Sequence, residues 1–158
     1  MPEIKVEKLS EATVNDLTEL IWEFQNDHAD LYGTYYKLKS GAKAKIGEIL
    51  GTLVRKRLTR VFLVFVDGKP TGYLFLDIKK NIPIYAVETY GYISGIYVRP
   101  QYRKLHLASK LLAEGEAWFR AMKIHRIELK VDLGNSIGQK LWAKAGYKPQ
   151  QIITFKDS

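Results

Sequence analysis

The chain has 158 residues, of which 46% are hydrophobic, and its 25 Lys and Arg against 17 Asp and Glu give a formal net charge of +8. This length suits one well-packed domain and is short for two, so we expect a single domain over residues 1–158. The absence of cysteine excludes disulfides, thiolate metal sites and a cysteine nucleophile. The positive charge favours a polyanionic partner: nucleic acid, anionic lipid or a phosphorylated cofactor.

No stretch of the chain predicts a membrane span or a signal peptide. No apolar run reaches the roughly 18 residues that a spanning helix needs. The opening MPEIKVEKLSEAT carries charges where a signal peptide has its apolar core. We therefore expect a soluble, cytoplasmic protein without a membrane partner.

The first part of the chain predicts a strand and two helices. Residues 4–9 alternate between apolar and charged side chains, as in a short strand. Thr13 and Asp16 open a helix whose apolar stripe fades in an irregular, aromatic and charged segment at residues 26–41. A second helix follows. The apolar stripes of the two helices are Val14, Leu17, Leu20, Ile21 and Phe24, then Ile46, Ile49, Leu50, Leu53 and Val54.

Three strands are expected next. The continuous apolar run Val61–Val66 predicts a strand that is buried on both faces. The turn signal Asp67–Pro70 joins it to a strand over residues 71–78, so the two form a hairpin. A further strand covers residues 88–98 and ends before Pro100.

The remaining elements alternate between helix and strand. The spacing becomes helical at Leu107, and residues 127–131 then alternate as a strand. Asn135 is a suitable N-cap for a helix that ends at Gly146, and a last strand is expected at residues 152–155. Hairpin-connected strands followed by strand-helix-strand units predict a mixed sheet flanked by helices.

Positive charge gathers where the helix from Leu107 should begin, at Arg103, Lys104 and His106. A helix N-terminus already carries partial positive charge, so cations are costly there unless an anion binds against them. The free N–H groups of a first turn, together with cations, make a pyrophosphate site, and residues 103–109 include no proline. The alternative is a helix with a solvated basic first turn. P-loop and Gly-x-Gly-x-x-Gly motifs are both absent.

Two motifs resemble those of the GCN5-related N-acetyltransferase (GNAT) family, which transfers acetyl from acetyl-CoA to amines. After IYVRPQYR, the segment 103–108 resembles the family pattern Arg/Gln-x-x-Gly-x-Gly/Ala, with His106 in place of a glycine. The family pattern Asn-x-x-Ala-x-x-x-Tyr-x-x-x-Gly-Phe resembles Asn135, Gly138, Trp142, Gly146 and Tyr147 at the same spacings. The resemblance, clear over residues 90–147, implies a GNAT-like α+β domain with a twisted mixed sheet of about six to seven strands and four helices.

The resemblance also implies how acetyl-CoA is bound, with a coenzyme-binding half near residues 85–147 and acceptor-side helices near residues 12–58. The pantetheine arm would pair with the strand around Ile96. The Ile96 N–H would stabilise the oxyanion of a tetrahedral intermediate, and Asn135 would help to position the arm. The implied coenzyme-binding residues are Ile96, Tyr97, Val98, Asn135 and Trp142, with Arg103, Lys104, Leu105, His106, Leu107, Ala108 and Ser109 at the pyrophosphate.

The chain departs from the family at both proton-transfer positions. Two residues before Ile96, where many members have a glutamate base, it has Ser94, and Trp142 replaces the tyrosine that protonates the thiolate. An indole cannot do that at neutral pH. Glu88 shares the strand parity of Ser94 but lies about 20 Å away along an ideal strand, so a bulge or a water chain would have to bring it in. Either other groups serve, or transfer is slow, or the protein binds the coenzyme without catalysing.

The segment between the first two helices is the expected acceptor site. Its carboxylates and aromatic rings could bind an alkylammonium through ion pairing and cation–π contact. The alternative is a solvated loop anchored by its aromatics. The scattered histidines suggest no metal site. The residues of the expected acceptor site are Asp27, His28, Asp30, Tyr32, Tyr35 and Tyr36.

We therefore expect a metal-free, acetyl-CoA-dependent N-acetyltransferase whose acceptor is a small-molecule or peptide amine that attacks within a ternary complex. A second hypothesis is a coenzyme A-binding domain that is catalytically weak or regulatory. A third is a basic nucleic-acid-binding module that uses residues 37–45 and 55–60, although cations at a helix end ordinarily complement its dipole. The last strand could pair with a second subunit, which makes a homodimer plausible.

Overall fold

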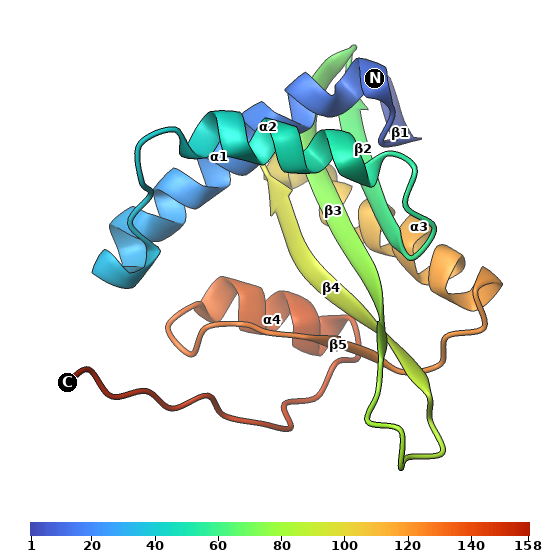
Figure 1. Cartoon of the computed structure of the whole chain (residues 1–158). Helices are drawn as coiled ribbons and strands as arrows, with labels where there is room; N and C mark the ends of the chain where they lie inside the picture. The colour runs from blue at the N-terminus through green and yellow to red at the C-terminus, as the bar shows by residue number, and fades with distance from the viewer.

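A twisted five-stranded sheet forms the centre of the molecule in the computed structural model, which describes residues 1–158 (Figure 1). The strands lie in the order β1-β2-β3-β4-β5; the first four are antiparallel and β5 is parallel to β4. The sheet is therefore mixed, as predicted. The strands are β1 (Ile4–Lys8), β2 (Thr59–Val66), β3 (Lys69–Lys80), β4 (Thr89–Val98) and β5 (Ile127–Leu129).

Helices cover both faces of this sheet. In Figure 1, α1 and α2 cross one face and α3 lies behind the other. Trp142 of α4 packs in the same core as α3. None of the helices combines the length and the hydrophobicity that a membrane-spanning helix requires. The helices are α1 (Val14–Tyr32), α2 (Ala42–Leu53), α3 (Leu107–Ala121) and α4 (Ser136–Lys144), with short 3-10 turns η1 (Glu11–Thr13), η2 (Thr34–Tyr36) and η3 (Pro100–Leu105).

Two hydrophobic cores form because side chains point alternately to the two faces of each strand. Leu63 and Val64 are neighbours in β2, and both are 0% exposed, which confirms that this strand is buried on both faces. The core under α1 and α2 includes Leu17, Leu20, Leu50, Leu63, Tyr73 and Tyr97. The core against α3 and α4 includes Val64, Leu74, Leu76, Leu111, Phe119 and Trp142.

The first helix is longer than its apolar stripe predicts. α1 continues to Tyr32, so the expectation of irregular structure from residue 26 is wrong for this part. Phe24, His28 and Tyr32 recur at every fourth residue and therefore lie on one helix face. Their ring centroids are 5.6 Å and 4.6 Å apart, so aromatic contacts continue the stripe beyond its aliphatic part.

The last predicted strand is not formed, so the sheet has five strands instead of six or seven. Residues 148–158 follow α4 without regular structure, and Ile152 and Phe155 are 74% and 86% exposed. Such side chains favour a strand only where a neighbouring strand offers a surface to pack on. β5 at the edge of the sheet is only three residues long. Pairing of this tail in a homodimer stays a prediction.

Candidate active site at the opening between two strands

β4 loses contact with β5 partway along its length. The two strands pair only at residues 91–93 of β4, opposite residues 127–129 of β5. β4 nevertheless remains paired with β3 as far as Val98. The other edge of residues 94–98 has no neighbouring strand, so its backbone groups can pair with an extended ligand that carries amides.

A β-bulge marks the point where the two strands separate. Phe75 lies opposite Gly95 and Leu76 lies opposite Ile93, so Ser94 is an extra residue in β4. A bulge bends its strand and increases the local twist. This bend is consistent with the divergence of β4 from β5 at the same residue.

The residues expected to bind the pantetheine arm alternate across the sheet. Ile96 and Val98 pack toward α3, whereas Tyr97 packs into the core under α1 and is 7% exposed. Burial raises the pKa of Tyr97, and the carboxylates of Glu23 and Asp27 raise it further. Tyr97 is therefore a neutral phenol at physiological pH that lies near the acidic side of α1.

His106 occupies the backbone conformation that explains the family's glycine at this position. It precedes α3 with φ 54° and ψ 34°, in the left-handed region. Glycine adopts this region without steric cost, and histidine is among the other residues found there most often. The substitution therefore preserves the turn from η3 into α3 at some cost in backbone strain.

The first turn of α3 offers backbone donors close to the open strand edge. Lys110 N–H donates to the His106 carbonyl, so the N–H groups of residues 107–109 have no acceptor within the helix. The Nε of Arg103 donates to the Val98 carbonyl at 3.1 Å and holds this turn against the end of β4. These groups fit a pyrophosphate. The cationic side chains of the turn, Arg103, Lys104 and His106, are all exposed.

The second motif caps and packs α4. Asn135 is the N-cap, as predicted, because its Oδ1 accepts a hydrogen bond from the Gly138 N–H at 2.9 Å. Trp142 is 8% exposed and packs edge-on to the Tyr147 ring, with centroids 5.2 Å apart. Packing accounts for the indole at this position. Contacts of Asn135 and Trp142 with a coenzyme stay predictions.

Neither expected base position brings a carboxylate to the opening. Ser94 is exposed and carries only a hydroxyl. Glu88 precedes β4 in the loop of the β3–β4 hairpin, where its carbonyl accepts a hydrogen bond from the Asn81 N–H. The bulge does not bring Glu88 close to Ser94, because it adds only one residue to β4 and the two residues remain far apart along the strand.

Sequence reasoning missed Asp77, which is the carboxylate that does reach Ser94. The Ser94 hydroxyl donates to Asp77 Oδ2 at 2.6 Å, and the Thr59 hydroxyl donates to Oδ1 at 2.8 Å. Asp77 belongs to β3 and to no motif. Only the register of the β3–β4 hairpin, which the bulge shifts, could have indicated it.

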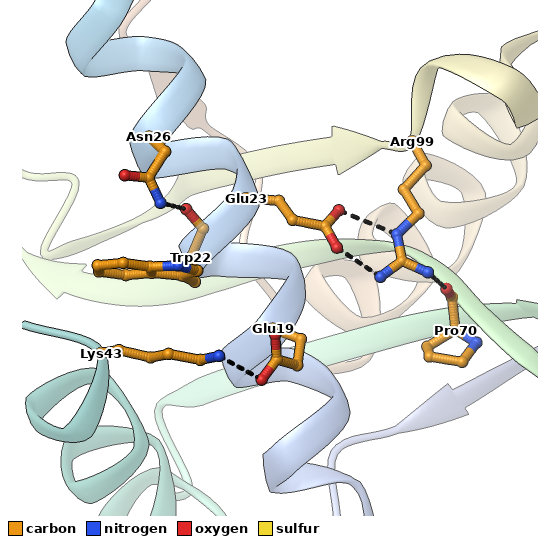
Figure 2. A network of polar contacts seen from close by, with 7 residues as sticks. All are labelled: Glu19, Trp22, Glu23, Asn26, Lys43, Pro70 and Arg99. Atoms are coloured by element: carbon orange, nitrogen blue, oxygen red, sulfur yellow. Dashed lines mark hydrogen bonds and ion pairs between the residues drawn. The ribbon is translucent and has the colours of Figure 1, made fainter.

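An ion pair joins α1 to the end of β4 (Figure 2). Arg99 donates from Nε and Nη2 to the two carboxylate oxygens of Glu23, at 2.9 Å and 2.6 Å, and from Nη1 to the Pro70 carbonyl at 2.8 Å. The hydrogen bond to Glu23 raises the pKa of Arg99. This contact holds α1 against the end of β4.

The aromatic and acidic cluster expected to bind the amine lies at the end of α1 and in η2. The His28 ring lies 4.6 Å from the Tyr32 ring and 4.2 Å from the Tyr36 ring. Its Nε2 is 4.0 Å from the Asp132 carboxylate, which follows β5. α1 therefore reaches the chain on the far side of the opening. The exposed members of the cluster are Asp27, Asp30, Tyr35 and Tyr36.

Other parts of the molecule offer less chemistry. No group of three or more His, Asp or Glu side chains could hold a metal ion. A surface depression of about 640 Å³ lies between α1 and α2, lined by Asn15, Thr18, Glu19, Gly41, Lys43, Ala44 and Gly47. It includes no residue of β4 or α3.

The open β4 edge and the donor-rich turn together suit a long ligand with amides at one end and a pyrophosphate at the other, as in coenzyme A. The model of the acetyltransferase (GNAT) family matches residues 14–147. The chain therefore belongs to the GNAT family of acetyltransferases.

Solved acetyltransferases share the fold. The aminoglycoside N-acetyltransferase AAC(6')-Iy in complex with CoA has a TM-score of 0.77 at 16% identity, covering 100% of this chain and 96% of that one. The aminoglycoside 6'-N-acetyltransferase AAC(6')-IG from Acinetobacter haemolyticus has a TM-score of 0.75 at 19% identity, covering 98% of each chain. A predicted acetyltransferase from Clostridium acetobutylicum with acetyl-CoA has a TM-score of 0.80 at 13% identity, covering 98% of this chain and 96% of that one. Among curated proteins, no sequence matches this chain significantly.

Proposed function

We propose that this protein transfers the acetyl group of acetyl-CoA to a primary amine, which attacks directly within a ternary complex. The observation that supports this most directly is that the unpaired edge at residues 94–98 is followed by a helix turn whose N–H groups, at residues 107–109, are free. Bound acetyl-CoA would supply an activated acetyl thioester. No metal is required, because the oxyanion can be stabilised by a backbone N–H.

Each part of the site has a proposed task. The strand at Ile96, Tyr97 and Val98 would pair with the pantetheine amides, and the Ile96 N–H would stabilise the oxyanion. The turn at residues 103–109 would bind the pyrophosphate. The amide nitrogen of Asn135 would donate to the pantetheine arm, because its Oδ1 already caps α4.

The α1 side of the opening would receive the amine. The Asp27 and Asp30 carboxylates are exposed there, and the neutral phenol of Tyr97 lies near Asp27. Negative charge beside aromatic faces attracts an ammonium group. A small cationic molecule with primary amines is therefore the acceptor class that we favour, and the aminoglycoside acetyltransferases among the similar structures support the same choice.

Two measurements test this function. Acetyl-CoA should raise the melting temperature of the protein, and free thiol should then be released in the presence of aminoglycosides, polyamines or lysine-containing peptides. Lys104→Glu should weaken acetyl-CoA binding by about tenfold or more because it places a negative charge at the pyrophosphate. Lys144→Glu, the same change in an exposed residue at the end of α4, should not. Failure of acetyl-CoA to stabilise the wild-type protein would contradict the proposal.

A coenzyme-binding domain without efficient transfer is the second candidate. It is favoured by the exposed hydroxyl at Ser94 and by the buried indole at Trp142, which replace the family's base and acid. Stabilisation by acetyl-CoA without thiol release on any amine would support it. Binding of nucleic acid is less well supported, because Arg55 pairs with Glu11 and Lys43 pairs with Glu19.

A further inference from the structure

Asp77 lies beside the bulge at Ser94, on the face of the sheet that α1 and α2 cross. Side chains alternate along β3, so Asp77 shares its face with Tyr73 and Phe75, which pack in the core under α1 and α2. Its partner across β4 is Tyr92, and the next residues along that strand are Ile93 and the extra residue Ser94. Asp77 therefore lies on the side from which the proposed amine would approach.

Building on the proposed function, we propose that Asp77 accepts the proton of the acceptor amine through the Ser94 hydroxyl. The pair would supply the base that the Ser94 position alone lacks. An ionised carboxylate only accepts hydrogen bonds, so in the 2.6 Å contact the Ser94 hydroxyl is the donor. The two lone pairs of its oxygen are then free to accept a hydrogen bond from an incoming ammonium group.

The proton transfer balances without another reactant. The ammonium group first gives one proton to Ser94 Oγ, which leaves a neutral amine with a free lone pair. That lone pair then forms the bond to the acetyl carbon, the C–S bond breaks, and the second proton that the nitrogen loses goes to the departing thiolate of coenzyme A. The proton already on Ser94 Oγ moves to Asp77 Oδ2, so the serine is unchanged and the carboxylate becomes a carboxylic acid. Thr59 donates to Oδ1 at 2.8 Å, which leaves Oδ2 directed at Ser94.

The charged and titratable groups around the pair are compatible with this role. Lys79 lies two residues along β3, and its Nζ is 3.8 Å from the centre of the Tyr92 ring. Burial raises the pKa of Tyr92, and Tyr90, Glu128 and Asp77 raise it further. Tyr92 is therefore neutral at physiological pH. The Glu128 carboxylate pairs with Arg126 Nε at 2.8 Å, so Asp77 is the carboxylate that would attract an ammonium group.

The contribution expected of such a pair is large enough to measure. A primary amine with a pKa near 10 is only about 0.1% neutral at pH 7, so a route for its proton is worth up to about 1,000-fold in rate. General bases typically contribute about 10²- to 10⁴-fold. A purely structural role, in which Asp77 only joins three strands around the bulge, would affect stability instead of the dependence of the rate on pH.

The decisive experiment compares two acceptors in three variants. One acceptor is an alkylamine that the wild-type protein acetylates, and the other is hydroxylamine, which is largely neutral at pH 7 and needs no base to become nucleophilic. Asp77→Asn keeps the shape of the side chain but replaces one of the two accepting oxygens by an amide nitrogen, which only donates, and Ser94→Ala removes the exposed hydroxyl. Asp67→Asn is the matched control, because Asp67 lies in the turn at the other end of β3.

Asp77→Asn and Ser94→Ala should each lower kcat/KM for the alkylamine at pH 7 by about 100-fold or more. The loss should shrink as the pH approaches 10, hydroxylamine turnover should change by less than about threefold, and acetyl-CoA should still raise the melting temperature. Asp67→Asn should match the wild type. Equal losses for both acceptors, or an unchanged pH profile with the alkylamine, would overturn the relay while leaving the proposed function in place. A wild-type protein that acetylates neither acceptor would overturn both.

Discussion

Glu23 in α1 and Arg99 at the end of β4 form an ion pair with two parallel hydrogen bonds (Figure 2). The residues are 76 positions apart in the chain, and their side chains are 36% and 24% exposed. Paired, partly desolvated charges of this geometry are stronger than ordinary surface ion pairs. The contact therefore sets the distance between the proposed acceptor helix and the proposed coenzyme strand.

Glu23→Ala should lower the free energy of unfolding by about 1–2 kcal/mol, because it leaves a half-buried guanidinium without its partner. Glu19→Ala, one turn earlier in the same helix, breaks a 2.6 Å pair with Lys43 whose side chains are 54% and 43% exposed. As the control, Glu19→Ala should lower the free energy of unfolding by less than about 0.5 kcal/mol. Urea unfolding of the two variants measures the difference. Equal losses would show that the Arg99 contact contributes no more than a surface ion pair.

Gly115 sets how closely α3 approaches the sheet. A Cβ at this position would lie 2.6 Å from Leu74 Cδ2 and 3.0 Å from Leu76 Cδ1. Gly115→Ala should therefore destabilise the protein by about 1–3 kcal/mol through overpacking. In Gly51→Ala the new Cβ meets nothing within 4 Å, so this change in α2 should stabilise by about 0.5–1 kcal/mol through helix propensity. Thermal or urea unfolding should therefore show a lower stability for Gly115→Ala and a higher stability for Gly51→Ala than for the wild type. Stabilisation by both changes would refute the packing argument.

The parts of the site that could be predicted are those encoded by neighbours in sequence. The N-cap at Asn135 and the cationic turn before Leu107 depend on a few adjacent residues, and both lie where the sequence indicated. β2 could be predicted because a strand buried on both faces needs a continuous apolar run, whatever the identity of its neighbours.

The features that could not be predicted depend on partners distant in sequence. Ser94 and Asp77 are 17 residues apart, and they meet only because one bulge shifts the register of the hairpin. The tail at residues 152–155 has strand-like side chains, but a strand also requires an edge to pair with. Local propensity carries no information on either point.

The left-handed conformation of His106 can be separated from the chemistry of its imidazole. His106→Gly and His106→Ala both remove the ring, but only alanine keeps a Cβ at φ 54°. His106→Ala should therefore be less stable than His106→Gly by about 1–2 kcal/mol. Urea unfolding gives this difference, and equal stabilities would argue against strain. Acetyl-CoA affinity of the glycine variant, measured in parallel, shows whether the imidazole contributes to pyrophosphate binding.

Tyr147 should make the protein sensitive to alkaline pH. Its hydroxyl is buried without a hydrogen-bond partner, and burial, with a smaller effect of the Glu116 carboxylate, raises the pKa of Tyr147 to about 12. The pKa of an unfolded tyrosine is about 10, so above that pH the unfolded chain loses a proton that the folded protein retains. The folded state is therefore progressively disfavoured between about pH 10 and pH 12.

Tyr147→Phe removes this ionisation and keeps the ring that packs on Trp142. The urea midpoint of the variant should fall less steeply than that of the wild type as the pH rises above about 10. A smaller decline should remain, because burial also raises the pKa values of Tyr73 and Tyr97. At pH 7 the variant should be as stable as the wild type or more stable by about 1 kcal/mol, since the lost hydroxyl had no partner. Parallel pH profiles for the two proteins would show that Tyr147 titrates alike in the folded and unfolded states.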